Sequence, residues 1–69
     1  MKNTYAVQFE TITGKTLFIR NYENGLNTVT SDERKVFLFT NKETARQAAR
    51  YFLSYVLPEY ATFEIYKTN

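Results

Sequence analysis

The sequence contains neither cysteine nor histidine among its 69 residues. Without cysteine the chain can form no disulfide, and without both residues it lacks the ordinary ligands of zinc. The same absences exclude the Ser–His and Cys–His pairs that activate nucleophiles in many enzymes. Two glycines, Gly14 and Gly25, are too few for a glycine-rich phosphate-binding loop. We therefore expect no catalytic, cofactor-binding or metal-binding residues, and a protein that is not an enzyme.

Long apolar runs and a strong excess of one charge are also missing. The first ten residues have no apolar stretch of the length that a signal peptide needs, and no segment approaches the length of a membrane span. We expect no membrane partner and a cytoplasmic location, in the cytoplasm of the host cell if the protein is phage-encoded. The net charge is +2, which is weaker than the dense basic patches typical of nucleic-acid-binding domains.

What the sequence does have is aromatic residues, six Phe and six Tyr. A chain of this length has room for one domain, residues 1–69, and buries only about 60% of the surface that its unfolded form exposes. Because disulfides and zinc are excluded, stability has to come from packing of these rings. If the rings exceed what one helix on one sheet can cover, the surplus points to a partner or to self-association.

Hydrophobic periodicity predicts strands in the first half of the chain. Residues 5–22 alternate as a β-hairpin with a turn at 13–15. Residues 26–30 follow a second turn and fit a short edge strand, and residues 31–34 fit a single helical turn capped by Ser31. Residues 36–39, Val-Phe-Leu-Phe, are apolar on both faces and predict an inner strand.

The second half predicts one helix and a last strand. Residues 40–43 have the form of a capping box with Thr40 as the N-cap, and Asn41 is the alternative cap. Pro58 ends the helix, and residues 62–67 alternate as a strand. Helical spacing makes the inward stripe Ala45, Ala48, Ala49, Phe52 and Val56. The fold class is therefore α+β, a three- to four-stranded antiparallel or mixed sheet with one helix on one face, in the order β-β-(β)-β-α-β.

The acidic residues that fall inside predicted strands include Glu10 and Glu64. Across a sheet they could meet as a general acid and base. Charged residues on strands are far more often solvated on a polar face, and this is the interpretation that we favour.

The outer side of the predicted helix suggests a binding surface. Lys42, Arg46 and Arg50 fall on one side at four-residue spacing, and Leu53 and Leu57 fall close to them. Either residues 21–34 fold over this end of the helix, or the end is exposed. An exposed patch of Leu and Tyr with Arg at its rim resembles a protein interface. The candidate partner-binding residues are then Arg46, Arg50, Tyr51, Leu53 and Leu57.

Two kinds of partner fit this surface. A protein partner, which includes a second copy of the chain in a homodimer, fits the Leu and Tyr residues. Nucleic acid is the alternative, with Lys42, Arg46 and Arg50 contacting phosphates, and three charges alone would give weak, strongly salt-dependent binding.

The pattern as a whole resembles small accessory proteins encoded by bacteriophages and prophages of Gram-positive bacteria. It comprises a hairpin beginning YAVQF, a GK turn, VTSDER and VFLFTNKETA before a short helix. In that group a phrase matched here by Phe39 to Glu43 and Ala45 opens the helix. Some small phage proteins of this size, including anti-CRISPR proteins, inhibit host machinery by binding. The resemblance implies a non-enzymatic binding role, and it identifies no target.

Overall fold

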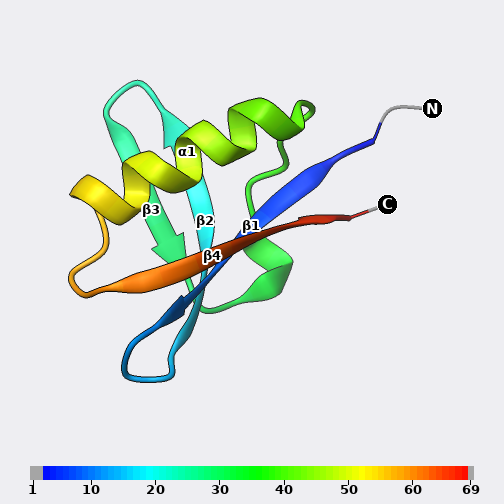
Figure 1. The fold of residues 1–69 in the computed structure, drawn as a ribbon. Coiled ribbons are helices and arrows are strands. Elements are labelled where there is room, and N and C mark those ends of the chain that lie inside the picture. The colour runs from blue at the N-terminus through cyan, green and yellow to red at the C-terminus, as the bar shows by residue number, and fades with distance from the viewer. Residues whose placement is uncertain (1–2, 69) are drawn as a thin grey trace.

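The computed structural model describes residues 3–68, and within that range the strands form one four-stranded sheet. The elements are β1 (Tyr5–Thr11), β2 (Thr16–Glu23), β3 (Leu26–Thr30), the 3-10 helix η1 (Glu33–Lys35), α1 (Lys42–Tyr55) and β4 (Ala61–Lys67). The strand order is β3-β2-β1-β4, and all neighbours are antiparallel. Helix α1 lies across one face of the sheet (Figure 1). This confirms the predicted α+β class, and the optional strand at 26–30 is present.

Strand alternation places the core on the face of the sheet that α1 covers. Val7 and Phe9 of β1 and Ile19 of β2 are fully buried. β4 pairs with β1 along seven residues, from Tyr5↔Lys67 to Thr11↔Ala61. The turns that join β1 to β2 and β2 to β3 contain Gly14 and Gly25, whose φ angles are 89° and 78°. Glycine adopts such angles at little cost, as these tight turns require.

The predicted inner strand at 36–39 is wrong. β1 and β2 pair only from Gln8↔Phe18 to Glu10↔Thr16 within the described chain and then diverge. Residues 37–39 fill the gap, where Phe37 N–H donates to the Ile19 carbonyl and Tyr5 exchanges two hydrogen bonds with Phe39. Phe39 is buried, but Leu38 is 52% exposed. The apolar segment therefore fills the space between the diverging strands β1 and β2. It forms one isolated bridge, between Phe39 and Tyr5, and no strand.

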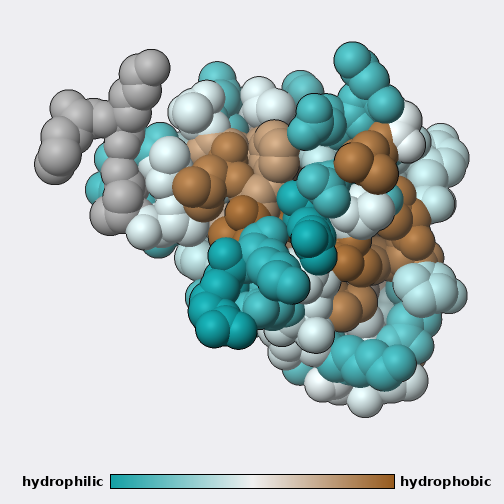
Figure 2. Space-filling model, turned by 180° about the vertical axis from the view of Figure 1, so that it is seen from behind, coloured by the Kyte–Doolittle hydropathy of each residue, from teal (hydrophilic) through white to brown (hydrophobic). Residues whose placement is uncertain are grey.

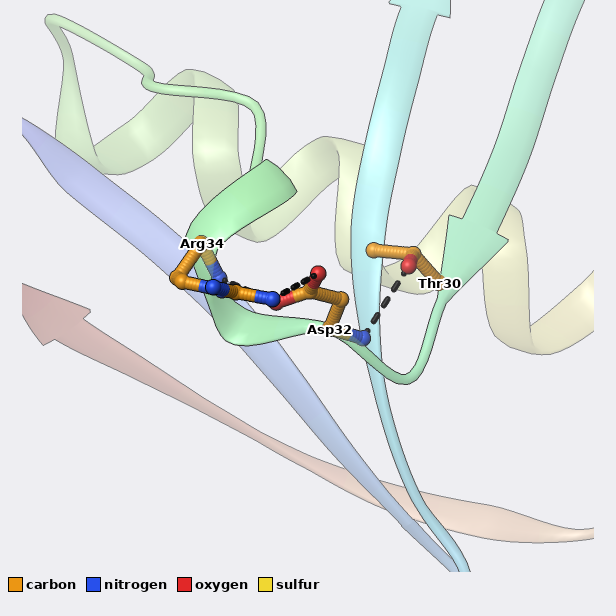
Figure 3. A network of polar contacts seen from close by, with 3 residues as sticks. All are labelled: Thr30, Asp32 and Arg34. Atoms are coloured by element: carbon orange, nitrogen blue, oxygen red, sulfur yellow. Dashed lines mark hydrogen bonds and ion pairs between the residues drawn. The ribbon is translucent and has the colours of Figure 1, made fainter.

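The turn that precedes this segment has a different cap from the predicted one. Residues 31–34 were expected to form a helical turn capped by Ser31, whereas η1 spans 33–35 and its N-cap is Asp32. Asp32 Oδ1 accepts the Arg34 backbone N–H at 3.0 Å, and both its oxygens lie 3.1 Å from the Arg34 side chain (Figure 3). Thr30 Oγ1 accepts the Asp32 N–H at 3.0 Å. The two oxygens of the Asp32 carboxylate accept the Arg34 backbone N–H and two side-chain N–H groups of Arg34 together, and a serine hydroxyl has a single oxygen to offer.

Asn41 caps α1, so Thr40 was the wrong choice of the two predicted caps. Asn41 Oδ1 accepts the backbone N–H groups of Glu43 at 2.7 Å and Thr44 at 3.2 Å. Glu43 is paired with Arg46 and not with the cap. The helix ends at Tyr55, three residues before Pro58. The predicted inward stripe is confirmed, since Ala45, Ala48, Ala49 and Phe52 are fully buried and Val56 is half-buried.

The centre of the core is the contact between Phe52 of α1 and Phe9 of β1. Their rings stack with centroids 6.0 Å apart and an angle of 20° between planes. We predict that Phe52→Ala lowers the free energy of unfolding by about 3–5 kcal/mol, because it leaves a cavity beneath the helix. This is comparable to the whole stability of so small a domain. Thermal and urea unfolding should show no cooperative transition near that of the parent, and a near-parental melting temperature would contradict the assignment.

Substitutions at the helix start separate the two caps. Asn41→Ala removes an acceptor of two backbone N–H groups, and we expect a loss of about 1 kcal/mol. Thr40→Ala is the matched control and should change stability by much less. Urea unfolding of both variants provides the measurement. A larger loss for Thr40→Ala than for Asn41→Ala would contradict the observed cap.

Candidate interaction surface

A row of aromatic rings leads from the core to one exposed flank of α1. We call Tyr22, Tyr51 and Tyr55 the tyrosine row. The ring centroids of Tyr51 and Tyr55 are 5.1 Å apart, and those of Tyr22 and Tyr51 are 6.4 Å apart. Tyr22 also lies 6.1 Å from the buried ring of Phe52. At the outer end, Tyr51 is 41% and Tyr55 77% exposed. Two exposed rings are thus anchored on the core through their neighbours.

Two shallow depressions border Tyr22. The first is lined by Tyr51 and by the turn between β2 and β3, where Glu23, Asn24 and Asn27 offer carboxylate and amide groups. The second is lined by residues 37–41 and Thr44. The surface around Tyr22 therefore combines aromatic rings with hydrogen-bonding groups.

Apolar side chains are exposed on the other side of the molecule as well. Figure 2 shows from behind that hydrophobic patches lie between hydrophilic groups. Leu26, at the start of β3, is 51% exposed. Leu38 is 52% exposed but lines the second depression beside Tyr22. At the far end of the sheet, Ile12 and Tyr60 are joined by a hydrogen bond from Ile12 N–H to the Tyr60 carbonyl, and both side chains are largely exposed.

Three of the five predicted partner-binding residues, Arg46, Arg50 and Leu53, lie on the flank of α1 turned away from Tyr22. At about 100° per residue, Leu53 is about 160° around the axis from Tyr51, whereas Arg46 and Arg50 are within about 60° of Leu53. Leu57 follows the helix, which ends at Tyr55, and its N–H donates to the Phe52 carbonyl. The helix therefore brings three of the residues together and places Tyr51 on the opposite flank. Leu53 and Leu57 are half-buried and pack against the core cluster.

Of the 21–34 connection, the end of β2 lies against the other flank of the helix, where the Tyr22 ring contacts Tyr51 and Phe52. The 3-10 helix η1 instead contacts Tyr66 on the opposite face of the sheet. We had expected either that residues 21–34 fold over the end of the helix or that this end is exposed, and each expectation holds for one flank. Tyr51 is partly covered by this connection, and the Leu53 flank is only half covered.

Lys42, Arg46 and Arg50 form a basic ridge along the helix, and this ridge carries one ion pair. Arg46 Nη1 lies 3.1 Å from Glu43 Oε1, one turn earlier. Within residues 3–68, neither Lys42 nor Arg50 is within ion-pair distance of an acidic group. Both are exposed. The pairing with Glu43 offsets part of the ridge's charge, which weakens its attraction for phosphates.

Glu10 and Glu64 lie on the face of the sheet opposite α1. Gln8 is paired with Glu64, and Glu10 is paired with Thr62, so the two glutamates are diagonal neighbours. A shallow depression lined by these four residues and Phe63 lies there. Both glutamates are exposed, and no hydrogen bond or ion pair joins them within the described residues. This placement fits the solvated polar face that we favoured.

A tyrosine near this face interacts with η1. The Tyr66 hydroxyl donates to Glu33 Oε2 at 3.3 Å, and the Tyr66 ring meets the edge of Phe18 with centroids 6.5 Å apart. Burial, then the negative charge of Glu33 and the hydrogen bond to it, raise the pKa of Tyr66 above its ordinary value. η1 is therefore tied to β4 by a contact that depends on the neutral phenol.

The described part of the chain contains neither a cluster of metal ligands nor a helix that could span a membrane. Residues 3–68 contain no group of three or more potential metal-ligating side chains close together. No helix among them is both long enough and apolar enough to cross a bilayer.

Sequence reasoning missed Tyr22 and Tyr55 as members of a surface. The helical spacing of Tyr55 puts it at the edge of the inward stripe, but its exposure depends on which elements pack beside α1. Tyr22 was assigned to the hairpin, and a strand pattern does not reveal that its ring lies against a helix 29 positions later in the chain. The surplus of aromatic residues over what a small core can bury was the available signal.

The hydrogen bond between Tyr66 and Glu33 predicts a change of stability at alkaline pH. Because the folded-state pKa of Tyr66 is raised, its contribution to stability is fully present below the unfolded pKa of about 10 and is lost as pH rises through the folded pKa. Tyr66→Phe should remove this part of the alkaline destabilisation. Glu33→Gln should move the pKa of Tyr66 back toward its ordinary value. Urea unfolding measured across alkaline pH tests the first effect, and titration of labelled tyrosine rings by NMR tests the second. An unchanged Tyr66 pKa in Glu33→Gln would contradict the contact.

Comparison with known proteins adds no relative. No protein-family model, no curated protein and no solved structure matches this chain.

Proposed function

We propose that this protein is a small non-enzymatic binding module that acts through protein–protein interaction, with the tyrosine row as its contact surface. The observation that carries the proposal is the exposure of Tyr55 and Tyr51, 77% and 41%, although each ring is held by an aromatic neighbour. Tyrosine is enriched among the residues that dominate binding energy at protein interfaces.

The arrangement of the rings favours binding on energetic grounds. A side chain loses rotational freedom when a partner immobilises it, and this loss opposes association. Tyr51 contacts Tyr22, Phe52 and Tyr55, so much of its freedom is already lost in the unbound protein. The adjacent Asn24 and Asn27 add amide groups that can satisfy polar atoms of a partner. Prearranged rings next to adaptable amides are typical of protein-binding surfaces.

The resemblance to phage and prophage accessory proteins supports a partner in a Gram-positive host cell. A binding module with no catalytic constellation among its described residues acts by occupying a surface, and inhibition of a host macromolecular machine is the corresponding activity. Nucleic acid is the weaker alternative, because Glu43 already pairs with Arg46 of the basic ridge.

The test is capture of partners from a Gram-positive lysate, with and without nuclease, by the tagged parent protein and by two tagged variants. Tyr55→Ser should lose the specific partner protein. Tyr60→Ser is the matched control, since Tyr60 is 76% exposed and lies outside the tyrosine row, and it should retain that partner. Truncation of a central anchor typically costs about 2 kcal/mol or more, or roughly a thirtyfold loss of affinity measured with the purified partner.

Two results would contradict the proposal. In the first, Tyr55→Ser and Tyr60→Ser retain the same proteins as the parent. In the second, nuclease abolishes capture and Arg46→Ala weakens direct nucleic-acid binding with a flatter salt dependence. The second result would favour the basic ridge. Circular dichroism of each variant must first show that it is folded.

A further inference from the structure

Strand β4 forms one edge of the sheet, and its outer side is unpaired within residues 3–68. Along β1, Tyr5 exchanges hydrogen bonds with Phe39 on the inner side, whereas Ile12 donates to Tyr60 on the β4 side. Because backbone groups of an antiparallel strand alternate in direction, the even-numbered residues of β4 face β1. The outward N–H and C=O groups belong to Ala61, Phe63, Ile65 and Lys67.

This edge lacks most of the features that protect edge strands from pairing. Protected edges are short, bulged, or interrupted by proline or charged residues. β4 has seven residues, keeps one regular register with β1 and contains no proline, and its charged residues are Glu64 at its centre and Lys67 at its end. The opposite edge, β3, has five residues, and its register with β2 shifts between Ile19 and Asn21. β4 is therefore the edge that can accept another strand.

Apolar side chains adjoin the same edge. Phe63 and Ile65 project from β4 toward the helix side, and both are half-buried. Leu53 lies on the flank of α1 away from Tyr22 and β2, and Leu57 follows the end of the same helix; both are half-buried and pack against the core. We call these four residues the β4 flank. A strand that pairs with β4 would bring its own side chains against them.

We propose that a second copy of this chain pairs with β4, antiparallel and about a two-fold axis, to form a homodimer with a continuous eight-stranded sheet. Because the copies are related by a two-fold axis, the outward N–H and C=O groups of β4 in one copy can form hydrogen bonds with the same groups of the other copy. Each copy also supplies its own β4 flank, so the half-exposed leucines of two helices meet over the new strand pair. This surface is separate from the tyrosine row and does not depend on the proposed function.

Side-chain pairing selects the register. An axis at Glu64 would place two glutamates directly opposite each other, which is destabilising. An axis at Phe63 places Phe63 opposite its copy, Thr62 opposite Glu64 and Ala61 opposite Ile65. The same arrangement brings Lys67 toward Glu59 of the other copy, which lies in the bend just before β4 and carries the opposite charge. Glu59 accepts from the Thr13 hydroxyl through Oε1 at 2.6 Å.

The size of the interface requires both the strand and the helix. A stable dimer commonly buries about 800 Å² per partner, which is about one sixth of the 4795 Å² accessible surface of this chain. Pairing of β4 alone is a narrow contact. The leucines of the β4 flank extend it on the helix side, and this accounts for their incomplete burial in the single chain.

The test combines sedimentation with disulfide trapping of the purified protein. We expect a concentration-dependent monomer–dimer equilibrium. Because the parent lacks cysteine, Thr62→Cys and Glu64→Cys introduce single thiols. An equimolar mixture of the two variants should form the mixed disulfide under mild oxidation, since opposed residues of a non-hydrogen-bonded pair are about 4.5 Å apart at Cα. A mixture of Tyr55→Cys and Tyr60→Cys is the control and should not be trapped.

Charge exchange tests the register independently. Lys67→Glu should weaken dimerisation about fivefold or more, since two such pairs form per dimer. The double variant Lys67→Glu/Glu59→Lys should restore it. Tyr55→Ser should leave dimerisation unchanged, so a failure of this proposal is distinguishable from a failure of the tyrosine row. A strict monomer at millimolar concentration, or a dimer trapped through Tyr55→Cys and not through residues 62 and 64, would overturn the proposal.

Discussion

The stacking of Phe52 on Phe9 is the contact on which the rest of this structure depends. The chain has no disulfide and no cysteine or histidine to hold a metal, so burial of apolar surface has to stabilise it. Three alanines, Ala45, Ala48 and Ala49, are fully buried beside Phe52. Their small side chains let the helix backbone come close to β1 and β4, and one phenylalanine then fills the remaining space. Because Phe52 is the one large side chain that α1 buries fully, the helix side of the core has little redundancy.

This narrow core also explains why the surface is rich in aromatic rings. α1 packs mainly on β1 and β4, so Tyr22 of β2 is left at the margin of the helix, where it contacts Tyr51. On the other margin, β4 is an edge strand, and the leucines above it are half covered. One helix on four strands therefore leaves two different flanks incompletely buried. The tyrosine row and the β4 flank have the same structural origin.

The parts of the fold that local sequence predicts are those governed by local periodicity and by turn residues. Alternation over 5–22, the glycine turns and the alanine stripe all correspond to the structure. The segment 36–39 could not be assigned in the same way, because its composition also fits a buried strand. It fills the gap between β1 and β2 only because these two strands diverge, and local sequence does not show that divergence. The flank of Leu53 was predictable from helical geometry. The contact of Tyr22 with Tyr51 was not, because it depends on how the hairpin is placed against the helix.

The pairing of Tyr5 with Lys67 places the start of β1 and the end of β4 side by side, at the same end of the sheet (Figure 1). Tension applied between these two residues pulls the strands apart sideways. The hydrogen bonds between them then break one after another, because each bears the load in turn. Strands pulled along their length would share the load among all their bonds at once. A processive unfolding machine that grips the chain beyond Lys67 would therefore peel β4 away first and expose Phe9 and Phe52 early, so this small domain offers little mechanical resistance from that end.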